Sequence, residues 1–393
     1  MARAPKLRLD AAQALAAEET PRARISQRPR RRRPGEPEMR VAQAALAGQE
    51  RAVNLSENPI VVEVARGDRV ESAHRGAGAV VDADGAVVFA FGDIARPVFP
   101  RSAVKAMQSL PLIESGAADR FGLTPQELAL ACASHSGEPG HVAGAAGILA
   151  KAGLAEDALA CGAHWPLGPE AARALAREGR EPTPLHNNCS GKHAGFLCVA
   201  CALGAPAEGY ETPGHPVQRE VKAALEDVCG EPLDEARRGL DGCSIPAYAI
   251  SLRGLAHGFA RMATGRGLGA QRAAAARRLF AAISAHPFEV AGTGRFDTLA
   301  MTLLAGKAIT KTGAEGVFCA ALPELGLGLA VKADDGATRA AEVMIAALIS
   351  RFVATPDAFA ALTRPKLTNW RGAQVGRIRP AGILDLKASL SGV

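Results

Sequence analysis

The sequence predicts an α/β fold of the α+β kind, with a mainly antiparallel sheet built from N- and C-terminal strands and flanked by helices. Short runs rich in β-branched residues lie between residues 59 and 91 and return after residue 306, whereas helical patterns dominate from Ser102 to about Phe288. Strands at both ends and helices between them favour one sheet assembled from distant segments. The central helices are then expected to form a helical subdomain on that sheet.

The first strands are predicted near the N-terminus. Apolar runs occur at Ile60–Arg66, Val70–His74, Gly78–Asp82 and Ala86–Phe91. They are separated by Arg-Gly-Asp, Arg-Gly-Ala-Gly and Ala-Asp-Gly segments, which are typical of turns. Short strands joined in this way predict an antiparallel meander.

Amphipathic periodicity predicts the helices that follow. Their ranges are Ser102–Ser115, Thr124–Cys132, Gly140–Ala152, Glu170–Glu178, Lys192–Leu203, Pro216–Val228, Ile245–Ala263 and Gln271–Ala285. Strands are predicted again at Lys307–Thr312, Gly316–Ala321 and Gly326–Lys332. A long amphipathic helix over Asp335–Val353 is expected to close the body.

The net charge of +6 is carried by the N-terminal extension. Residues 1–52 contain twelve Lys or Arg and six Asp or Glu, which leaves 34 basic and 34 acidic residues in the remainder. A neutral body has no electrostatic footprint for phosphate backbones, so no nucleic-acid partner is expected. Residues 1–56 lack sustained periodicity and predict a disordered extension, unless they carry a localisation signal or Met39 is the true start.

Composition and cysteine usage indicate where the protein works. Apolar residues make up 48% and charged residues 22%, which is ordinary for a globular domain. Several of the eight cysteines lie in apolar runs such as Gly195–Leu203, where a thiol packs as a small hydrophobe. No apolar stretch reaches about 18 residues and no apolar segment follows the basic N-terminus, so no membrane partner is expected. We therefore expect a reducing, cytoplasmic location.

A serine and a lysine are placed for nucleophilic catalysis at the start of the first predicted helix. Ser102 and Lys105 are three residues apart and share a helix face. A serine hydroxyl needs an adjacent base, and lysine serves only when it is neutral. Lys311, in the late Lys-Thr-Gly motif, supplies a second cation that would lower a neighbouring lysine pKa. This order of S-x-x-K and K-T-G is similar to that of β-lactamases and penicillin-binding proteins.

A second hydroxyl is expected from the motif Ser134-His-Ser136. The third position is Ser where β-lactamases have Asn, which argues against a β-lactam substrate. We interpret Ser134 as a second hydroxyl in a proton relay. The alternative is a serine that caps a turn before Gly137.

Two polar loops are typical of binding sites on a rigid scaffold: His186–Lys192 and Asp241–Pro246. Cys189 and Cys243 could be paired zinc ligands or two free thiols, and their sequence context leaves both possibilities open. Cys198 and Cys201 form a weaker rival pair inside an apolar helix. His164, His215 and His257 are expected to be structural, and His193 to orient its loop.

Six motifs, taken together, resemble those of the asparaginase II family of zinc-containing L-asparaginases. They are Arg101–Lys105, Ala133–Glu138, Cys161–Pro166, His186–His193, Asp241–Pro246 and Thr310–Gly316. The resemblance covers about residues 58–380. It implies a fold similar to serine β-lactamases and glutaminases, a homodimer, and hydrolysis of L-asparagine to aspartate and ammonia. The domain would then span residues 57–380, followed by a tail at 381–393.

The resemblance also implies roles for particular residues. Ser102 with Lys105, and Ser134 with Lys311, look like two Ser–Lys tandems around the substrate; Ser102 is the favoured nucleophile, and Ser134 remains the alternative. The zinc ligands of the family match Cys189, Lys192 and Cys243. Candidates for holding the α-carboxylate and α-ammonium of the substrate are Arg101, Asn188 and Asp241. A glutaminase, another amino-acid amidase, or a non-catalytic small-molecule binder are the alternative functions.

Overall fold

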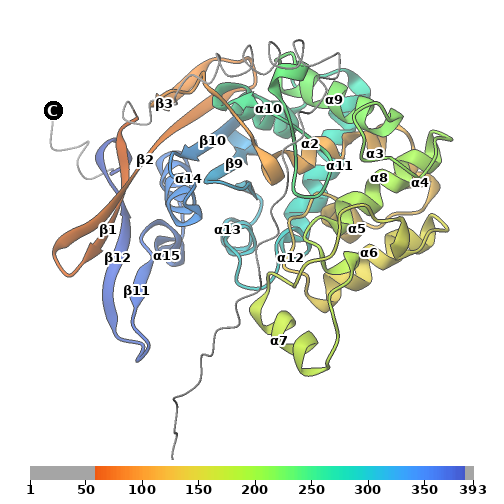
Figure 1. The fold of residues 1–393 in the computed structure, drawn as a ribbon. Helices are drawn as coiled ribbons and strands as arrows, with labels where there is room; N and C mark the ends of the chain where they lie inside the picture. The colour runs from red at the N-terminus through yellow and green to blue at the C-terminus, as the bar shows by residue number, and fades with distance from the viewer. Residues whose placement is uncertain (1–57, 386–393) are drawn as a thin grey trace, which may run out of the picture. The chain divides into compact units, whose positions relative to one another are not determined.

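The computed structural model describes residues 58–385, so the extension at residues 1–56 and positions 386–393 of the predicted tail lie outside it. An eight-stranded sheet has the order β11-β12-β1-β2-β10-β9-β8, with β3 paired to β2, and every pairing is antiparallel. Its strands are β1 Ile60–Arg66, β2 Arg69–Asp82, β3 Val87–Phe91, β8 Ile309–Thr312, β9 Val317–Leu322, β10 Leu327–Ala333, β11 Lys366–Thr368 and β12 Gln374–Pro380. The predicted antiparallel sheet assembled from both ends of the chain is confirmed (Figure 1).

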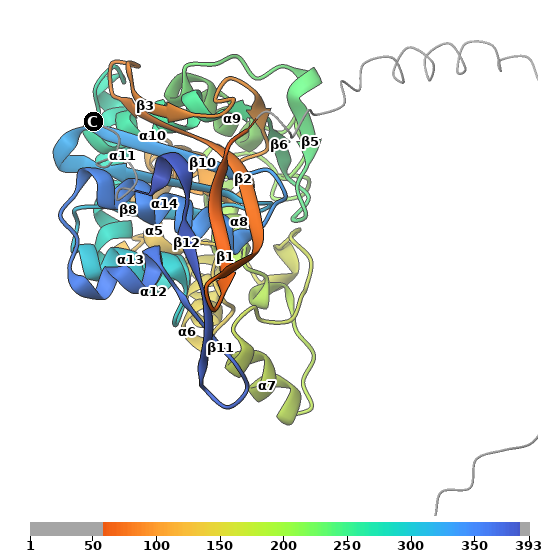
Figure 2. The same cartoon turned by 90° about the vertical axis from the view of Figure 1, so that its left-hand side faces the viewer.

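Helices cover the sheet and form a body beside it. They are α2 Lys105–Gln108, α3 Leu110–Glu114, α4 Ala117–Arg120, α5 Pro125–Ala131, α6 Pro139–Lys151, α7 Pro169–Arg177, α8 Ser190–Ala202, α9 Pro216–Cys229, α10 Leu252–Thr264, α11 Ala270–Ala285, α12 Pro287–Val290, α13 Phe296–Leu304, α14 Thr338–Phe352 and α15 Ala360–Thr363. Figure 1 shows α3 to α9 gathered on the side away from β11 and β12, as a helical subdomain. Two short ladders join β4 Pro97–Val98 to β7 Ile250–Ser251, and β5 Arg238–Leu240 to β6 Pro246–Tyr248; Figure 2 shows β5 and β6 beside each other.

The two faces of the sheet bury separate hydrophobic cores. Ala79 and Val81 of β2 belong to the core that contains α10 and the helical subdomain, whereas Val80 belongs to the core beneath α14. On β9, Cys319 belongs to the first of these cores and Phe318 to the core beneath α14. Successive side chains of a strand point to opposite faces, so each strand contributes to both cores. The central strands are therefore apolar at nearly every position.

Strand β2 runs through a segment that the sequence predicts as a turn. Its first half pairs with β1, and the half beginning at Gly76 pairs with β10. A Cβ at Gly76 would lie 2.5 Å from the carbonyl oxygen of Lys332, so glycine permits a close approach of backbones at this point. The predicted Arg-Gly-Ala-Gly turn is wrong. These residues lie inside β2, where Gly76 allows the backbone of β10 to approach closely.

Other predictions differ in detail. The range Ser102–Ser115 is a 3-10 helix, η1 Arg101–Val104, followed by α2 and α3. The helix predicted from Ile245 begins at Leu252, where the Ser251 hydroxyl accepts a hydrogen bond from the Gly254 N–H. Helix α14 does not close the body, because β11 and β12 follow it and β12 pairs with β1. The helices predicted elsewhere match α5, α6, α7, α8, α9 and α11 to within a residue or two.

None of the eight cysteines is in a disulfide, and seven of them are buried. Within the described range, no helix has both the length and the apolarity that crossing a bilayer requires.

Candidate active site

A cavity of about 320 Å³ brings most of the predicted site residues together. It lies where η1, the loop after α5, the start of α8, the β5–β6 loop and the end of β8 meet. Its lining residues are Arg101, Ser102, Ser134, His164, Leu167, Asn187, Asn188, Cys189, Asp241, Gly242, Cys243, Arg295, Thr312, Gly313 and Ala314. The predicted lysines Lys105, Lys192 and Lys311 are each at least 98% buried.

Backbone geometry around Ser102 places its hydroxyl at the end of β8. Arg101 has φ +51°, a left-handed conformation that is strained for a residue with a side chain and is common at functional sites. The Ala103 N–H donates to the Pro100 carbonyl oxygen and starts η1. A Cβ at Gly313 would lie 2.6 Å from that same oxygen. Because Gly313 of the Lys-Thr-Gly motif has no Cβ, the end of β8 can pack directly against the Pro100 carbonyl group that precedes η1.

The loop that carries Ser134 is held by neighbours far away in the sequence. Helix α5 begins with a capping box between Thr124 and Glu127, and it ends at Ala131, three residues before Ser134. The Ser134 N–H donates to the Val290 carbonyl oxygen at 3.0 Å. Its side-chain oxygen accepts from Asn188 Nδ2 at 3.3 Å and donates to Ser102 Oγ at 3.3 Å. The two predicted hydroxyls therefore meet at one wall of the cavity.

The two catalytic candidates among the lysines donate hydrogen bonds to backbone carbonyl groups. Lys105 Nζ donates to Ala133 O at 2.6 Å and to Asn188 O at 3.3 Å, so it lies next to the peptide that precedes Ser134. Lys311 Nζ donates to Thr312 O at 3.1 Å. Across residues 58–385, neither amine is hydrogen-bonded to either serine hydroxyl. Such contacts are often long before substrate binds.

Burial favours the neutral form of both amines. Desolvation is the main cause that lowers the pKa of Lys311 to about 7; the charge of Lys105 lowers it further, and the Asp297 carboxylate opposes the shift. Desolvation also lowers the pKa of Lys105, and Lys192 adds to that effect. A lysine base must be neutral at the working pH, which is the condition that the site approaches.

Asp297 is a site residue that the sequence reasoning missed. It lies on α13 and is 1% exposed. Its carboxylate accepts from Thr310 Oγ1 at 2.8 Å and from the Thr312 N–H at 3.1 Å, which fixes the end of β8 on both sides of Lys311. Its position in the sequence could have indicated this role, because Asp297 is an acidic residue in an otherwise apolar helical run shortly before the Lys-Thr-Gly motif.

Cys189, Lys192 and Cys243 lie close together in the structure. Lys192 Nζ donates to Cys243 Sγ at 3.0 Å. A hydrogen bond from Cys243 holds the pKa of the Cys189 thiol well below its ordinary value, and that same contact raises the pKa of Cys243. Burial lowers the pKa of Lys192, but the two neighbouring sulfurs outweigh it and raise the value.

This donor set fits a soft divalent metal. All three residues are buried, and Cys243 contacts both Cys189 and the Lys192 amine. Thiolate sulfur is a ligand that zinc prefers, and a neutral amine nitrogen can complete such a set. No group of three His, Cys, Asp or Glu side chains suited to a metal occurs between residues 58 and 385. In the set described above, the third donor is a lysine amine.

Arg101 is bound to another residue of the site. Its Nε and Nη2 donate to Asp241 Oδ1 at 3.0 and 2.8 Å, and the Gly242 N–H donates to the same oxygen at 2.6 Å. Burial would raise the pKa of Asp241, but the hydrogen bonds from Arg101 contribute to lowering it, together with nearby cations. Arg101 and Asp241 thus form an ionised pair at the cavity wall.

The histidines that the sequence reasoning set aside have structural contacts. His164 lines the cavity, but its Nε2 accepts from the Asn188 N–H and its Nδ1 contacts the Trp165 carbonyl oxygen. His215 and His257 each bond to backbone groups. His193 Nδ1 and the Tyr210 hydroxyl share a hydrogen bond of 2.6 Å.

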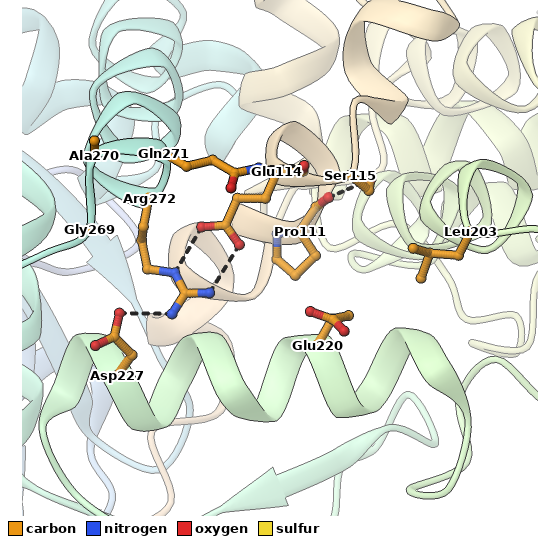
Figure 3. Close-up of a pocket in the computed structure, with 10 residues that line it drawn as sticks. All are labelled: Pro111, Glu114, Ser115, Leu203, Glu220, Asp227, Gly269, Ala270, Gln271 and Arg272. Atoms are coloured by element: carbon orange, nitrogen blue, oxygen red, sulfur yellow. Dashed lines mark hydrogen bonds and ion pairs between the residues drawn. The ribbon is translucent and has the colours of Figure 1, made fainter.

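A larger cavity, of about 510 Å³, lies elsewhere and lacks this chemistry (Figure 3). Its central side chain, Arg272, donates to both oxygens of Glu114 at 2.8 and 3.0 Å and to Asp227 at 2.8 Å. The Ser115 hydroxyl at its edge donates to the Pro111 carbonyl oxygen. No lysine lines this cavity to activate that serine, so size alone does not mark the reactive site.

Comparison with known proteins identifies the family. The model of the L-asparaginase II family, a family of asparaginase hydrolases, matches residues 62–380. No protein among those with curated descriptions matches the chain.

The solved structures that are similar to the chain include those of Mglu and of a β-lactamase. The crystal structure of Mglu is 15% identical, with a TM-score of 0.36, over 68% of this chain and 64% of Mglu. A β-lactamase from Mycobacterium bovis is 14% identical, with a TM-score of 0.32, over 73% of this chain and 92% of that protein. The family match covers most of the described body and all of the cavity residues. The chain therefore belongs to the L-asparaginase II family.

Proposed function

We propose that the protein is an L-asparagine amidohydrolase that releases aspartate and ammonia by Ser–Lys nucleophilic catalysis. The observation that carries the proposal is the 3.3 Å contact between the Ser102 and Ser134 hydroxyls at a cavity backed by two buried lysines. Membership of the L-asparaginase II family supports asparagine as the substrate.

In the first half of the reaction, Ser102 Oγ attacks the side-chain amide carbon of the substrate. The serine proton passes to the neutral amine of Lys105 and from there to the departing amide nitrogen, so ammonia leaves and an aspartyl ester of Ser102 remains. Ser134, which donates to Ser102 Oγ, orients the attacking oxygen. We favour Ser102 over Ser134 because it lies in the first turn of η1, directly after the strained residue Arg101.

In the second half, water cleaves the ester. The neutral amine of Lys311 takes a proton from the water, the hydroxide attacks the ester carbon, and the proton returns through Ser134 to Ser102 as aspartate leaves. The pKa of about 7 suits Lys311 to give and take protons near neutral pH. Both lysines end the cycle neutral, so the site is regenerated.

Zinc is part of the proposal, with Cys189, Lys192 and Cys243 as its ligands. When bound, it supplies a positive charge beside the cavity that orients polar groups of the substrate. The ligand residues must bind it as thiolates and a neutral amine, so acid weakens their affinity for the metal. The assembly that we propose for the protein is a homodimer, as in the family that it resembles.

The test is ammonia release from L-asparagine by the wild type and by Ser102→Ala and Lys311→Met. Each variant is expected to lose more than roughly 1,000-fold in kcat, because nucleophile and base act as a unit. Thermal unfolding confirms that each variant is folded. Assays with L-glutamine and D-asparagine define the substrate. Full activity in both folded variants would refute the mechanism, and a wild type inactive on L-asparagine would refute the function.

A further inference from the structure

We propose that Arg295 binds the α-carboxylate of the substrate and thereby selects amino acids. This inference rests on the proposed function, and it assigns a role that the sequence motifs give to Arg101. It follows from three features of Arg295: its place in the cavity wall, a side chain without a hydrogen bond or ion pair in the described part of the chain, and the firm anchoring of its loop.

Among residues 58–385, the guanidinium of Arg295 is not hydrogen-bonded or ion-paired to any side chain or backbone group. Arg295 lines the cavity and is partly exposed. Its side chain forms no hydrogen bond or ion pair with any other residue in the described range. By contrast, Arg101 is committed to Asp241 through two of its nitrogens. A guanidinium left with five free donors in a cavity is ready to bind an anion.

Charge balance in the cavity favours a carboxylate at Arg295. Arg101 and Asp241 neutralise each other, which leaves Arg295 as the unpaired fixed charge among the cavity-lining arginine and acidic side chains. The planar fork of arginine matches a carboxylate through two parallel hydrogen bonds. Arg295 is also close enough to Lys311 to affect its protonation, so an anion held by Arg295 lies near the reacting groups.

The segment that carries Arg295 is anchored on both sides. Before it, the Thr293 N–H and hydroxyl both donate to the Glu138 carboxylate at 2.7 Å, and Ser136 Oγ donates to the Ala291 carbonyl oxygen at 2.9 Å. After it, α13 is tied to β8 through Asp297. A binding group on such a support loses little entropy when ligand arrives.

The same geometry leaves a place for the substrate ammonium. All three hydrogen bonds that the Asp241 carboxylate accepts from described residues end on Oδ1. The second oxygen, Oδ2, retains acceptor capacity for an ammonium group. Arg295 and Asp241, on separate loops of one cavity, would therefore bind the two charged groups of an amino acid.

Truncated substrates test this role in the full-length protein. Succinamic acid keeps the carboxylate and lacks the ammonium, whereas 3-aminopropanamide keeps the ammonium and lacks the carboxylate. We expect Arg295→Met to lower kcat/KM roughly 10- to 100-fold for L-asparagine and succinamic acid. The rate with 3-aminopropanamide, already low in the wild type, should not change. Arg295→Lys should recover part of the loss by keeping the charge.

Controls separate binding from structure. Arg266→Met removes an arginine of the protein surface that pairs with Asp84, and it should behave as the wild type. An equal loss on all three substrates by a folded Arg295→Met, or no loss on L-asparagine, would overturn the role of Arg295 while leaving the asparaginase function intact. A wild type that releases no ammonia from L-asparagine would remove both.

Discussion

At the scale of single residues, the three buried lysines of the site differ in pKa because their amines have different neighbours. Lys105, Lys192 and Lys311 are all buried, yet the pKa of Lys192 is raised by adjacent sulfurs whereas the pKa values of the other two are lowered. Desolvation lowers the pKa of all three amines, and the neighbouring sulfurs outweigh it at Lys192 but not at Lys105. The sulfurs beside Lys192 favour its protonated form, whereas the desolvated surroundings of Lys311 favour the neutral form that a base requires.

Asp297 tunes Lys311, and this predicts a pH effect. The neutral fraction of Lys311 grows as pH rises through about 7, so kcat/KM is expected to fall on the acid side of that value. The Asp297 carboxylate raises the pKa of Lys311, so Asp297→Asn should move the acid limb to lower pH. The pH profile of kcat/KM for both proteins checks this. An acid limb that stays in place or moves to higher pH would contradict the assigned role of Asp297.

At the scale of elements, the site depends on close contact between β8 and the segment that begins η1. These parts are about two hundred residues apart along the chain. The sheet carries β8, and the Pro100 carbonyl oxygen packs against Gly313. Because a packed interior transmits small displacements, a shift of this contact would move Lys311 relative to both serines.

Gly313→Ala tests this contact. The new Cβ would lie 2.6 Å from the Pro100 carbonyl oxygen, so β8 or η1 must move. We expect a loss of about 1–3 kcal/mol in the free energy of unfolding and roughly 100-fold in kcat. Gly214→Ala is the matched control, since a Cβ there meets no atom within 4 Å. Denaturant unfolding and ammonia assays measure both effects, and equal behaviour of the two variants would contradict the packing argument.

At the scale of the whole molecule, the sequence allowed prediction of the sheet and of most residues that the structure brings to the cavity, because each depends on local patterns. Apolar runs marked β1, β8, β9 and β10, and the Ser102 and Lys311 motifs marked the site. Strand β12 was missed because its polar residues alternate with few apolar ones and its place is decided by pairing with β1. Asp297 and Arg295 lie outside the motifs, and their importance appears only when distant segments pack together.

Metal content tests the assignment of Cys189, Lys192 and Cys243. We expect about one zinc ion per chain in the purified protein. Cys189→Ser and Cys243→Ser should lose it, whereas Cys198→Ser, a thiol buried in α8 away from the cavity, should keep it. Elemental analysis after dialysis gives the stoichiometry. Zinc retained in both ligand variants, or lost from Cys198→Ser alone, would refute the proposed ligand set.

The most direct test of the central mechanism is mass spectrometry of the enzyme quenched during turnover of L-asparagine. The account predicts an aspartyl group on the peptide that contains Ser102, absent in Ser102→Ala and enriched when Lys311→Met slows hydrolysis of the ester. An aspartyl group on Ser134 would contradict the choice of nucleophile, and rapid ammonia release without any adduct in Lys311→Met would contradict covalent catalysis.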